Sequence, residues 1–302
     1  MAKEVVRSRQ TWIDSAITEA AVFGISPTDR FAVLGGAQHS LWGYAHFRSD
    51  YLGALCVGVQ KISLANLRTL LESSVTVIYG VPDLVGTMLR LCKHHSIQLP
   101  SVRRILLGGG PVLPRFPVDH LHQICPVAIT HRFYGATETS FIGHASLHGY
   151  YVAFPRVQVR IDDDQMMWVQ SPFTVAPCEW IATGDLGRWV GQKAFEVLGR
   201  SSRQIQVKGK KYAVEPIEQA LMDAFVVTHL ALVQDAKGRV NCVVASEESP
   251  PALNRINHIV QFVSPGFPLA RLVHVLPLSK WPLTQSGKTD WVALAGWLQG
   301  NT

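Results

Sequence analysis

Residues 104–111 read Arg-Ile-Leu-Leu-Gly-Gly-Gly-Pro, a short apolar run that stops at a row of glycines. A run of this length, bounded by a turn signal, is typical of a strand buried on both faces. Three similar runs occupy residues 31–34, 75–79 and 127–130, and the first two also end next to glycine. The amphipathic stretches between these runs predict helices near residues 41–52, 63–73, 82–95 and 114–124.

The alternation of strands and helices predicts the α/β class, with a layered parallel sheet covered by helices. Ligands in such sheets bind beyond the carboxyl ends of the strands. The glycine row and a second motif that begins at Tyr134 both follow predicted strands. We therefore expect a ligand site at that edge of the sheet.

The pattern changes after about residue 150. Residues 157–161 and 167–170 are typical of two hairpin strands, with the acidic turn 162–165 between them. The three adjacent aspartates of this turn could bind a divalent metal, but the flanking strands already explain them as a solvated turn. The sequence thus predicts a small β region beside the parallel sheet.

A second, smaller module begins near Gly199 and reads strand, helix, hairpin, helix, strand, loop and helix. We predict an N-terminal domain over residues 1–198 and a small α+β C-terminal domain over residues 203–302, with the boundary at 199–202.

The composition describes a globular protein. Of the 302 residues, 47% are hydrophobic and 17% are charged, which excludes a disordered chain. The net charge is +6, but the basic residues form no single stripe, so nucleic-acid binding is not expected. No apolar run reaches the ~20 residues of a membrane span, and none follows the first residues as a secretory signal would. The five cysteines form no CxxC pair, and we expect a cytoplasmic protein with reduced thiols.

The strongest chemical motif is Phe133-Tyr-Gly-Ala-Thr-Glu-Thr139, which follows the last predicted strand. The Tyr134 ring offers a stacking face, Thr137 can donate to a phosphate oxygen and Glu138 can hold Mg²⁺. This set of groups suits a nucleotide.

Four further motifs occur in a fixed order around it. They are Gly108-Gly109-Gly110-Pro111, Thr183-Gly184-Asp185, Gly199-Arg200 with Gln206-Val207-Lys208-Gly209, and Ser286-Gly287-Lys288-Thr289-Asp290. With these five motifs the chain resembles the superfamily of acyl-CoA synthetases, peptide-synthetase adenylation domains and luciferases. The matching motifs span residues 108 to 290.

The resemblance implies a role for each motif, and it makes residues 199–202 the hinge of a mobile C-terminal domain over residues 203–302. Gly109, Gly110 and Pro111 would form the adenine-binding turn, and Tyr134 with Gly135 would bind adenylate. Asp185 would hold the ribose hydroxyls, and Arg200 would contact ribose or phosphate. Taken alone, Asp185 is equally well a turn cap and Arg200 a surface arginine.

The same resemblance makes Lys288 a catalytic residue, together with Thr137 and Glu138. The Lys288 ammonium group would neutralise the negative charge that builds on the carboxylate and the α-phosphate as the acid attacks ATP. An isolated Gly-Lys pair would indicate a solvated lysine. The other four motifs, which occur in the family's order, argue against this interpretation of Lys288. Glycine at 209 would let a pantetheine arm pass close to the backbone.

The acyl pocket is implied less directly. His39 resembles the aromatic or histidine position near that pocket, although a capping or core histidine is an equal alternative. Gly80 and Gly108 would line the same pocket. The sequence does not name the acid.

The resemblance also has a gap. Relatives carry a Ser/Thr/Gly-rich loop ending in Pro-Lys that wraps the ATP phosphates, and residues 2–8 look like the stretch that follows it. We therefore expect an N-terminally truncated member. Lys3, Arg7 and Arg9 could replace part of the loop's phosphate contacts. The missing part would expose apolar surface and favour a homodimer or a partner subunit.

The function implied is that of an AMP-forming ligase. It would use ATP and Mg²⁺ to convert a small carboxylic acid into an acyl-adenylate, and would pass the acyl group to CoA or to the phosphopantetheine of an acyl carrier protein. The alternative is a catalytically incomplete or split-subunit protein that binds adenylate without completing the ATP reaction.

Overall fold

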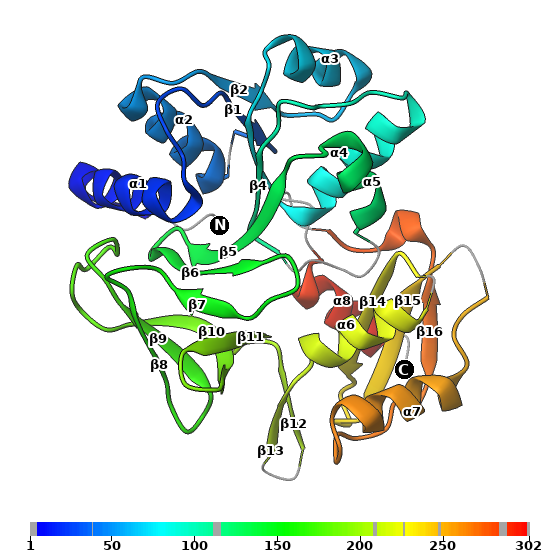
Figure 1. The fold of residues 1–302 in the computed structure, drawn as a ribbon. Helices are drawn as coiled ribbons and strands as arrows, with labels where there is room; N and C mark the ends of the chain where they lie inside the picture. The colour runs from blue at the N-terminus through cyan, green and yellow to red at the C-terminus, as the bar shows by residue number, and fades with distance from the viewer. Residues whose placement is uncertain are drawn as a thin grey trace. The chain divides into compact units, whose positions relative to one another are not determined.

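The computed structural model describes residues 5–37, 39–110, 116–207, 210–225, 227–246, 249–283 and 289–300. Contacts divide the chain into two compact units. The first comprises Met1–Thr183 and Gly187–Glu196, and the second comprises Gly184–Leu186 and Val197–Thr302. Each unit is described by itself below (Figure 1).

The first unit is built on a parallel sheet, as predicted. Its five parallel strands run in the spatial order β2-β1-β3-β4-β5. They are β1 (Phe31–Leu34), β2 (Cys56–Val59), β3 (Val77–Gly80), β4 (Arg104–Leu107) and β5 (Ile129–Ala136). The strands predicted at 31–34 and 104–107 have those bounds, whereas β5 continues to residue 136 because β6 pairs with it. The strand β2 was not predicted.

Helices cover both faces of these strands (Figure 1). On one face, α3 (Leu64–Glu72), α4 (Pro82–His94) and α5 (Val118–Ile124) bury a core against alternate residues of β1, β3 and β4. On the other face lie α1 (Arg9–Phe23) and α2 (Ser40–Leu52). The predictions for α2, α3 and α4 are correct within one or two residues. The predicted start of α5 at residue 114 lies outside the described residues, and α1 was not predicted.

The sheet then continues with antiparallel strands, in the order β6-β7-β11-β10-β9-β8. They are β6 (Ser140–Ser146), β7 (Tyr151–Ala153), β8 (Gln158–Ile161), β9 (Met166–Gln170), β10 (Ile181–Val190) and β11 (Ala194–Arg200). The predicted hairpin is β8–β9, and Asp162 in its turn accepts hydrogen bonds from the Met166 backbone and the Trp168 indole, both 2.9 Å long. The acidic turn therefore has structural partners of its own.

The second unit has the element order that the sequence predicted, with one added hairpin strand. Its strands are β12 (Gln204–Val207), β13 (Lys210–Ala213), β14 (His229–Gln234), β15 (Val240–Ala245) and β16 (Val273–Leu276). Its helices are α6 (Glu215–Ala224), α7 (Leu253–Val263) and α8 (Trp291–Gly300), besides a short 3-10 turn at Leu278–Lys280. The helices pack on the β14-β15-β16 sheet and bury a separate core.

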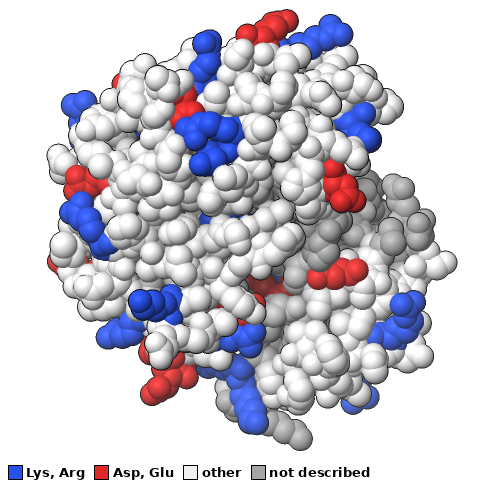
Figure 2. Space-filling model, viewed as in Figure 1, with Lys and Arg blue, Asp and Glu red and all other residues white. Residues whose placement is uncertain are grey.

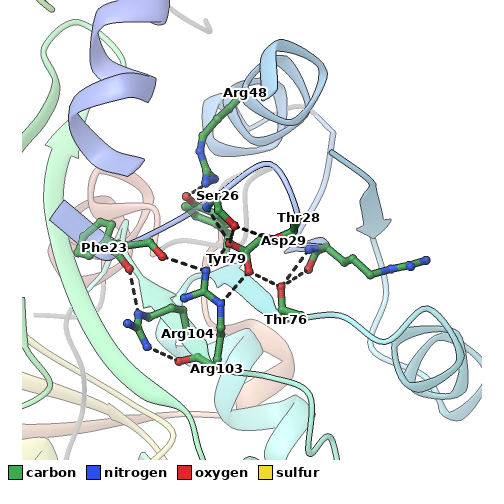
Figure 3. Close-up of polar contacts among 11 residues, drawn as sticks. Phe23, Ser26, Thr28, Asp29, Arg48, Thr76, Tyr79, Arg103 and Arg104 are labelled. Atoms are coloured by element: carbon green, nitrogen blue, oxygen red, sulfur yellow. Dashed lines mark hydrogen bonds and ion pairs between the residues drawn. The ribbon is translucent and has the colours of Figure 1, made fainter. Parts of the chain in front are cut away.

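A polar junction ties together the loops that precede β1, β3 and β4 (Figure 3). Asp29 is buried and accepts hydrogen bonds from Thr76 Oγ1 at 2.7 Å and from Arg103 Nε at 2.8 Å. Ser26 donates to the same carboxylate through its backbone N–H. Arg104 donates to the carbonyl of Phe23 and so satisfies the C-terminal end of α1. This junction lies at the amino edge of the sheet, away from the predicted ligand edge.

The charged side chains are scattered on one face of the molecule (Figure 2). On the face drawn in Figure 2 the lysine and arginine side chains stand singly or in small groups, separated by uncharged surface. None of the helices in the described part of the chain combines the length and apolar character that crossing a membrane requires.

Candidate active site

The parallel strands bring several predicted site residues to one edge of the sheet. Because β1, β3, β4 and β5 run parallel, their carboxyl ends lie side by side. His39 follows β1, Gly80 ends β3, and Gly108 to Gly110 follow β4. Thr137 and Glu138 follow β5 directly. These are the positions where α/β sheets bind ligands.

A β-bulge shapes the Tyr134 motif. The register between β5 and β6 shifts between Tyr134 and Gly135, where β6 carries one residue more than β5, Ile142. A Cβ on Gly135 would collide with the backbone carbonyl of Ser140, so only glycine fits. Residues 136–139 then turn tightly, with Thr139 donating to and accepting from the Ala136 backbone.

Thr137 stands at the tip of this turn and has two partners from elsewhere in the unit. Its hydroxyl donates to Ser40 Oγ, the first residue of α2, at 3.0 Å. Its carbonyl accepts from Arg7 Nη1 at 3.4 Å. Burial lowers the pKa of Arg7 to about 10, so the guanidinium stays charged at neutral pH.

The backbone of Glu138 is bound to the loop between β9 and β10, since the Val175 N–H donates to the Glu138 carbonyl at 2.9 Å. Its side chain is half-buried. Among the described residues no three His, Cys, Asp or Glu side chains form a group that could hold a metal ion. A single carboxylate suits Mg²⁺ that is also bound by nucleotide phosphates and water.

The two aromatic residues of the motif point to opposite faces of β5. Tyr134 packs on Tyr151 and Phe195, with ring centres 5.9 and 6.2 Å away. Phe133 lies over Gly108, where any Cβ would collide with its ring. The space beside Gly108 is thus filled by Phe133, and the proposed role of this glycine in an acyl pocket stays a prediction.

His39 lies just before α2 and its side chain is exposed, without a capping hydrogen bond. The alternative of a core histidine is therefore wrong, whereas His39 does occupy the N-cap position of α2, without a capping hydrogen bond from its side chain. A role near the acyl pocket remains a prediction.

In the second unit, Asp185 and Arg200 form an ion pair. Arg200 Nε lies 3.0 Å from Asp185 Oδ1, and the aspartate side chain is only 8% exposed. The backbone N–H of Arg200 donates to the carboxylate of Glu215. Burial raises the pKa of Glu215, and hydrogen bonding to this N–H opposes the rise. No motif pointed to Glu215, whose place depends on how α6 packs beside Gly199.

The predicted site residues Lys288, Pro111 and Gly209 lie outside the described residues. On the C-terminal side of Lys288, Thr289 bridges to Leu283 and accepts from the Trp281 indole at 3.1 Å.

The Trp291 ring centre lies 3.5 Å from the guanidinium carbon of Arg203. Arg203 also pairs with Glu218, which is buried.

The comparisons with known proteins agree with the resemblance in the motifs. A family model described as AMP-binding enzyme matches residues 1–171, more than half of the chain. The chain belongs to the AMP-binding enzyme family. The family includes acyl-CoA ligases and peptide-synthetase adenylation domains, as the motifs indicated.

Two curated relatives of this chain come from a bacterium and a fungus. The uncharacterized acyl–CoA ligase YhfT from Bacillus subtilis is 24% identical over 257 residues, which cover 76% of this chain and 52% of the relative. The nonribosomal peptide synthetase aclP from Aspergillus oryzae is 23% identical over 201 residues, 66% of this chain and 11% of that protein. The chain thus spans about half the length of the first relative, and a small part of the second.

Solved structures share the fold. The amide bond synthetase McbA from Marinactinospora thermotolerans superposes with a TM-score of 0.83 at 20% identity, over 98% of this chain and 66% of its own. The O-succinylbenzoate coenzyme A synthetase MenE from Bacillus subtilis, in complex with AMP, superposes with a TM-score of 0.79 at 22% identity, over 94% and 64%. At these identities the likeness establishes the α/β fold alone.

Proposed function

We propose that this chain activates a small carboxylic acid as its acyl-adenylate and transfers the acyl group to a thiol. The acceptor is CoA or the pantetheine of a carrier protein. The observation that carries the proposal is the Thr137–Glu138 turn, which stands at the carboxyl edge of a parallel sheet in an AMP-binding enzyme. The similarity to an acyl–CoA ligase and to a nonribosomal peptide synthetase supports the choice of a thiol acceptor.

The proposed reaction has two half-reactions. A carboxylate oxygen attacks the α-phosphorus of ATP, the bond to the β-phosphate oxygen breaks, and pyrophosphate leaves. A thiolate then attacks the acyl carbon, AMP leaves with the electron pair of the acyl–oxygen bond, and a thioester forms. Glu138 would hold Mg²⁺, which would supply charge neutralisation.

Residues of this chain take named roles in that scheme. Thr137 donates to an α-phosphate oxygen, and its hydroxyl is a strong donor in a partly buried turn. Asp185 accepts from the ribose hydroxyls, Arg200 contacts ribose or phosphate, and Lys288 stabilises the charge of the transition state. Rotation of residues 203–302 about 199–202 between the half-reactions is part of the proposal. Gly209 would then lie beside the pantetheine arm.

The first test measures ATP–pyrophosphate exchange with a panel of aliphatic and aryl acids. We expect Lys288→Ala to reduce kcat/KM by about 100-fold or more, because it removes charge stabilisation in the transition state. The matched control is Lys280→Ala, since Lys280 is exposed on the short turn before the same loop. Equal exchange by Lys288→Ala and the parent would reject the catalytic role.

The second test identifies the acceptor and the alternative function. CoA, a carrier protein and a simple amine are offered to the preformed acyl-adenylate; the amine is included because one structural relative is an amide bond synthetase. Calorimetry with AMP and with ATP-Mg²⁺ accompanies these assays. AMP binding without exchange or transfer for any acid would favour an adenylate-binding protein that does not complete the ATP reaction alone.

A further inference from the structure

Thr137 is held from two directions by residues outside its own motif. Ser40 contacts the side-chain hydroxyl of Thr137 from the start of α2. Arg7, just before α1, contacts the backbone carbonyl of the same residue across 130 positions of sequence. Both contacts lie within the first unit, so the orientation of this threonine depends on where two helices begin.

The Arg7 side chain is fixed in place. Its Nη2 donates to the Thr11 carbonyl at 3.3 Å, and its guanidinium carbon lies 5.5 Å from the centre of the Trp12 ring. Its Nε is buried and makes no hydrogen bond within the described residues. Arg7 is partly buried, and a buried donor without a hydrogen-bond partner is costly unless the residue serves a purpose beyond packing.

Ser40 and Thr137 form a chain of two hydroxyl groups. A hydroxyl donates one hydrogen bond and accepts up to two, so its proton can be turned toward another partner. When Thr137 donates to a phosphate oxygen, Ser40 can reverse its role and donate to Thr137 Oγ1. The reversed bond would hold the threonine rotamer and polarise its hydroxyl toward the phosphate.

We propose that Arg7 and Ser40 are positioning residues for the adenylation reaction, which present the Thr137 hydroxyl to the α-phosphate. This inference rests on the proposed function. Arg7 fixes the backbone of the turn, and Ser40 fixes the direction of the hydroxyl. Neither residue belongs to the five motifs that identified the family, and both act through Thr137.

The test is a double-mutant cycle in ATP–pyrophosphate exchange. We expect Ser40→Ala to lower kcat by about fivefold, the effect of one lost hydrogen bond, with the KM for the acid unchanged. Ser40→Thr, which keeps the hydroxyl, should recover most of this loss. In a Thr137→Ala background Ser40→Ala should have no further effect, because its partner is gone.

Arg7 is tested in the same cycle with Arg7→Met and Arg7→Lys. We expect Arg7→Met to lower kcat by about tenfold, and Arg7→Lys to recover part of it, since the lysine keeps the charge without the fork of donors. The controls are Ser63→Ala, which removes a helix-start serine remote from the motif, and Arg90→Met, which removes an exposed arginine on α4. Both should exchange like the parent.

The outcomes separate this inference from the proposed function. Equal losses from Ser40→Ala with and without Thr137, or no loss in any variant, would overturn the inference. If the parent binds AMP but shows no exchange, the proposed function fails. In that case the AMP dissociation constants of the same variants test the inference. We expect AMP binding to weaken by about fivefold, and an unchanged AMP affinity would contradict the inference.

Discussion

At the scale of single residues, the most buried charge of the first unit is the pair of Glu19 on α1 and Arg48 on α2. Both side chains are fully buried, and Arg48 Nε lies 3.2 Å from Glu19 Oε2. Tyr44 and Tyr79 donate to the same carboxylate, and the Arg48 guanidinium lies 4.3 Å from the centre of the Phe31 ring. Burial raises the pKa of Glu19, because lost hydration outweighs the attraction of Arg48. The pair therefore fixes how the two helices meet.

We predict that Arg48→Met destabilises the protein by about 3–5 kcal/mol, because it leaves a buried carboxylate without its cation. The free energy of unfolding is measured by urea denaturation. The matched control is Glu196→Gln, which breaks the solvent-exposed pair with Arg188 and should change stability by less than about 1 kcal/mol. Similar losses of stability from both substitutions would contradict the expectation that breaking the buried pair costs more than breaking the exposed one.

At the scale of elements, the bulge between β5 and β6 determines where the Thr137 turn stands. Gly135 admits the Ser140 carbonyl at a distance that no side chain allows, and Ser140 itself has a φ of 58°. The extra residue, Ile142 on β6, bends that strand where it pairs with the end of β5. The turn that carries Thr137 and Glu138 is thus aimed by backbone geometry and not by side-chain packing alone.

We predict that Gly135→Ala lowers stability by about 2 kcal/mol or more and weakens AMP binding, since the backbone must shift to admit a Cβ. The control is Gly43→Ala, because Gly43 lies inside α2 with open space around its Cα. That substitution should raise stability by up to about 1 kcal/mol. Thermal unfolding and AMP calorimetry on the two variants check both expectations, and a neutral Gly135→Ala would count against the bulge as a constraint.

The elements also show what a sequence pattern can and cannot predict. The strands β1 and β4 were predictable because β1 is apolar throughout and β4 is apolar after Arg104. The helix α1 was missed because its buried face carries Thr11, Ser15 and Glu19, which hides the amphipathic pattern. The carboxylate of Glu19 finds its partners only on α2 and β3, distant in sequence.

The candidate site also contains residues that the sequence predicts and residues that it does not. Thr137, Glu138 and Asp185 stand in contiguous motifs whose chemistry is visible in the residues themselves. Ser40 and Glu215 carry no such signal, because each acts on a residue that folding brings near it from at least 15 positions away. Contacts of this kind depend on helix placement, which periodicity does not specify.

At the scale of the whole molecule, two half-buried histidines link α1 to the middle of the large sheet. His131 on β5 and His144 on β6 both pack against Phe23, with ring centres 5.0 and 6.1 Å away. Burial lowers the pKa of both, and the neighbouring Arg104 lowers that of His131 further. Both rings are therefore neutral in the folded protein near pH 7.

We predict that the free energy of unfolding falls as the pH drops below about 6.5. His131 and His144 then bind protons in the unfolded state but stay neutral in the folded state. The loss continues until the pH passes the lowered folded pKa values. The double variant His131→Gln, His144→Gln should show a shallower slope in this window, measured by urea unfolding at pH 5 to 8. Exposed His148→Gln serves as the control, and a parent slope unchanged by the double variant would contradict the assignment.

The Asp29 junction has a consequence for the order in which the chain becomes organised during synthesis. Asp29 leaves the ribosome 47 residues before Thr76 and 74 residues before Arg103, the guanidinium to which it is hydrogen-bonded. A buried carboxylate without its cation opposes compaction, so we expect β1, β2 and β3 to gain their final packing only after β4 has emerged. Translation speed over residues 76–104 thus sets how long an unfinished sheet edge is exposed to chaperones and to aggregation.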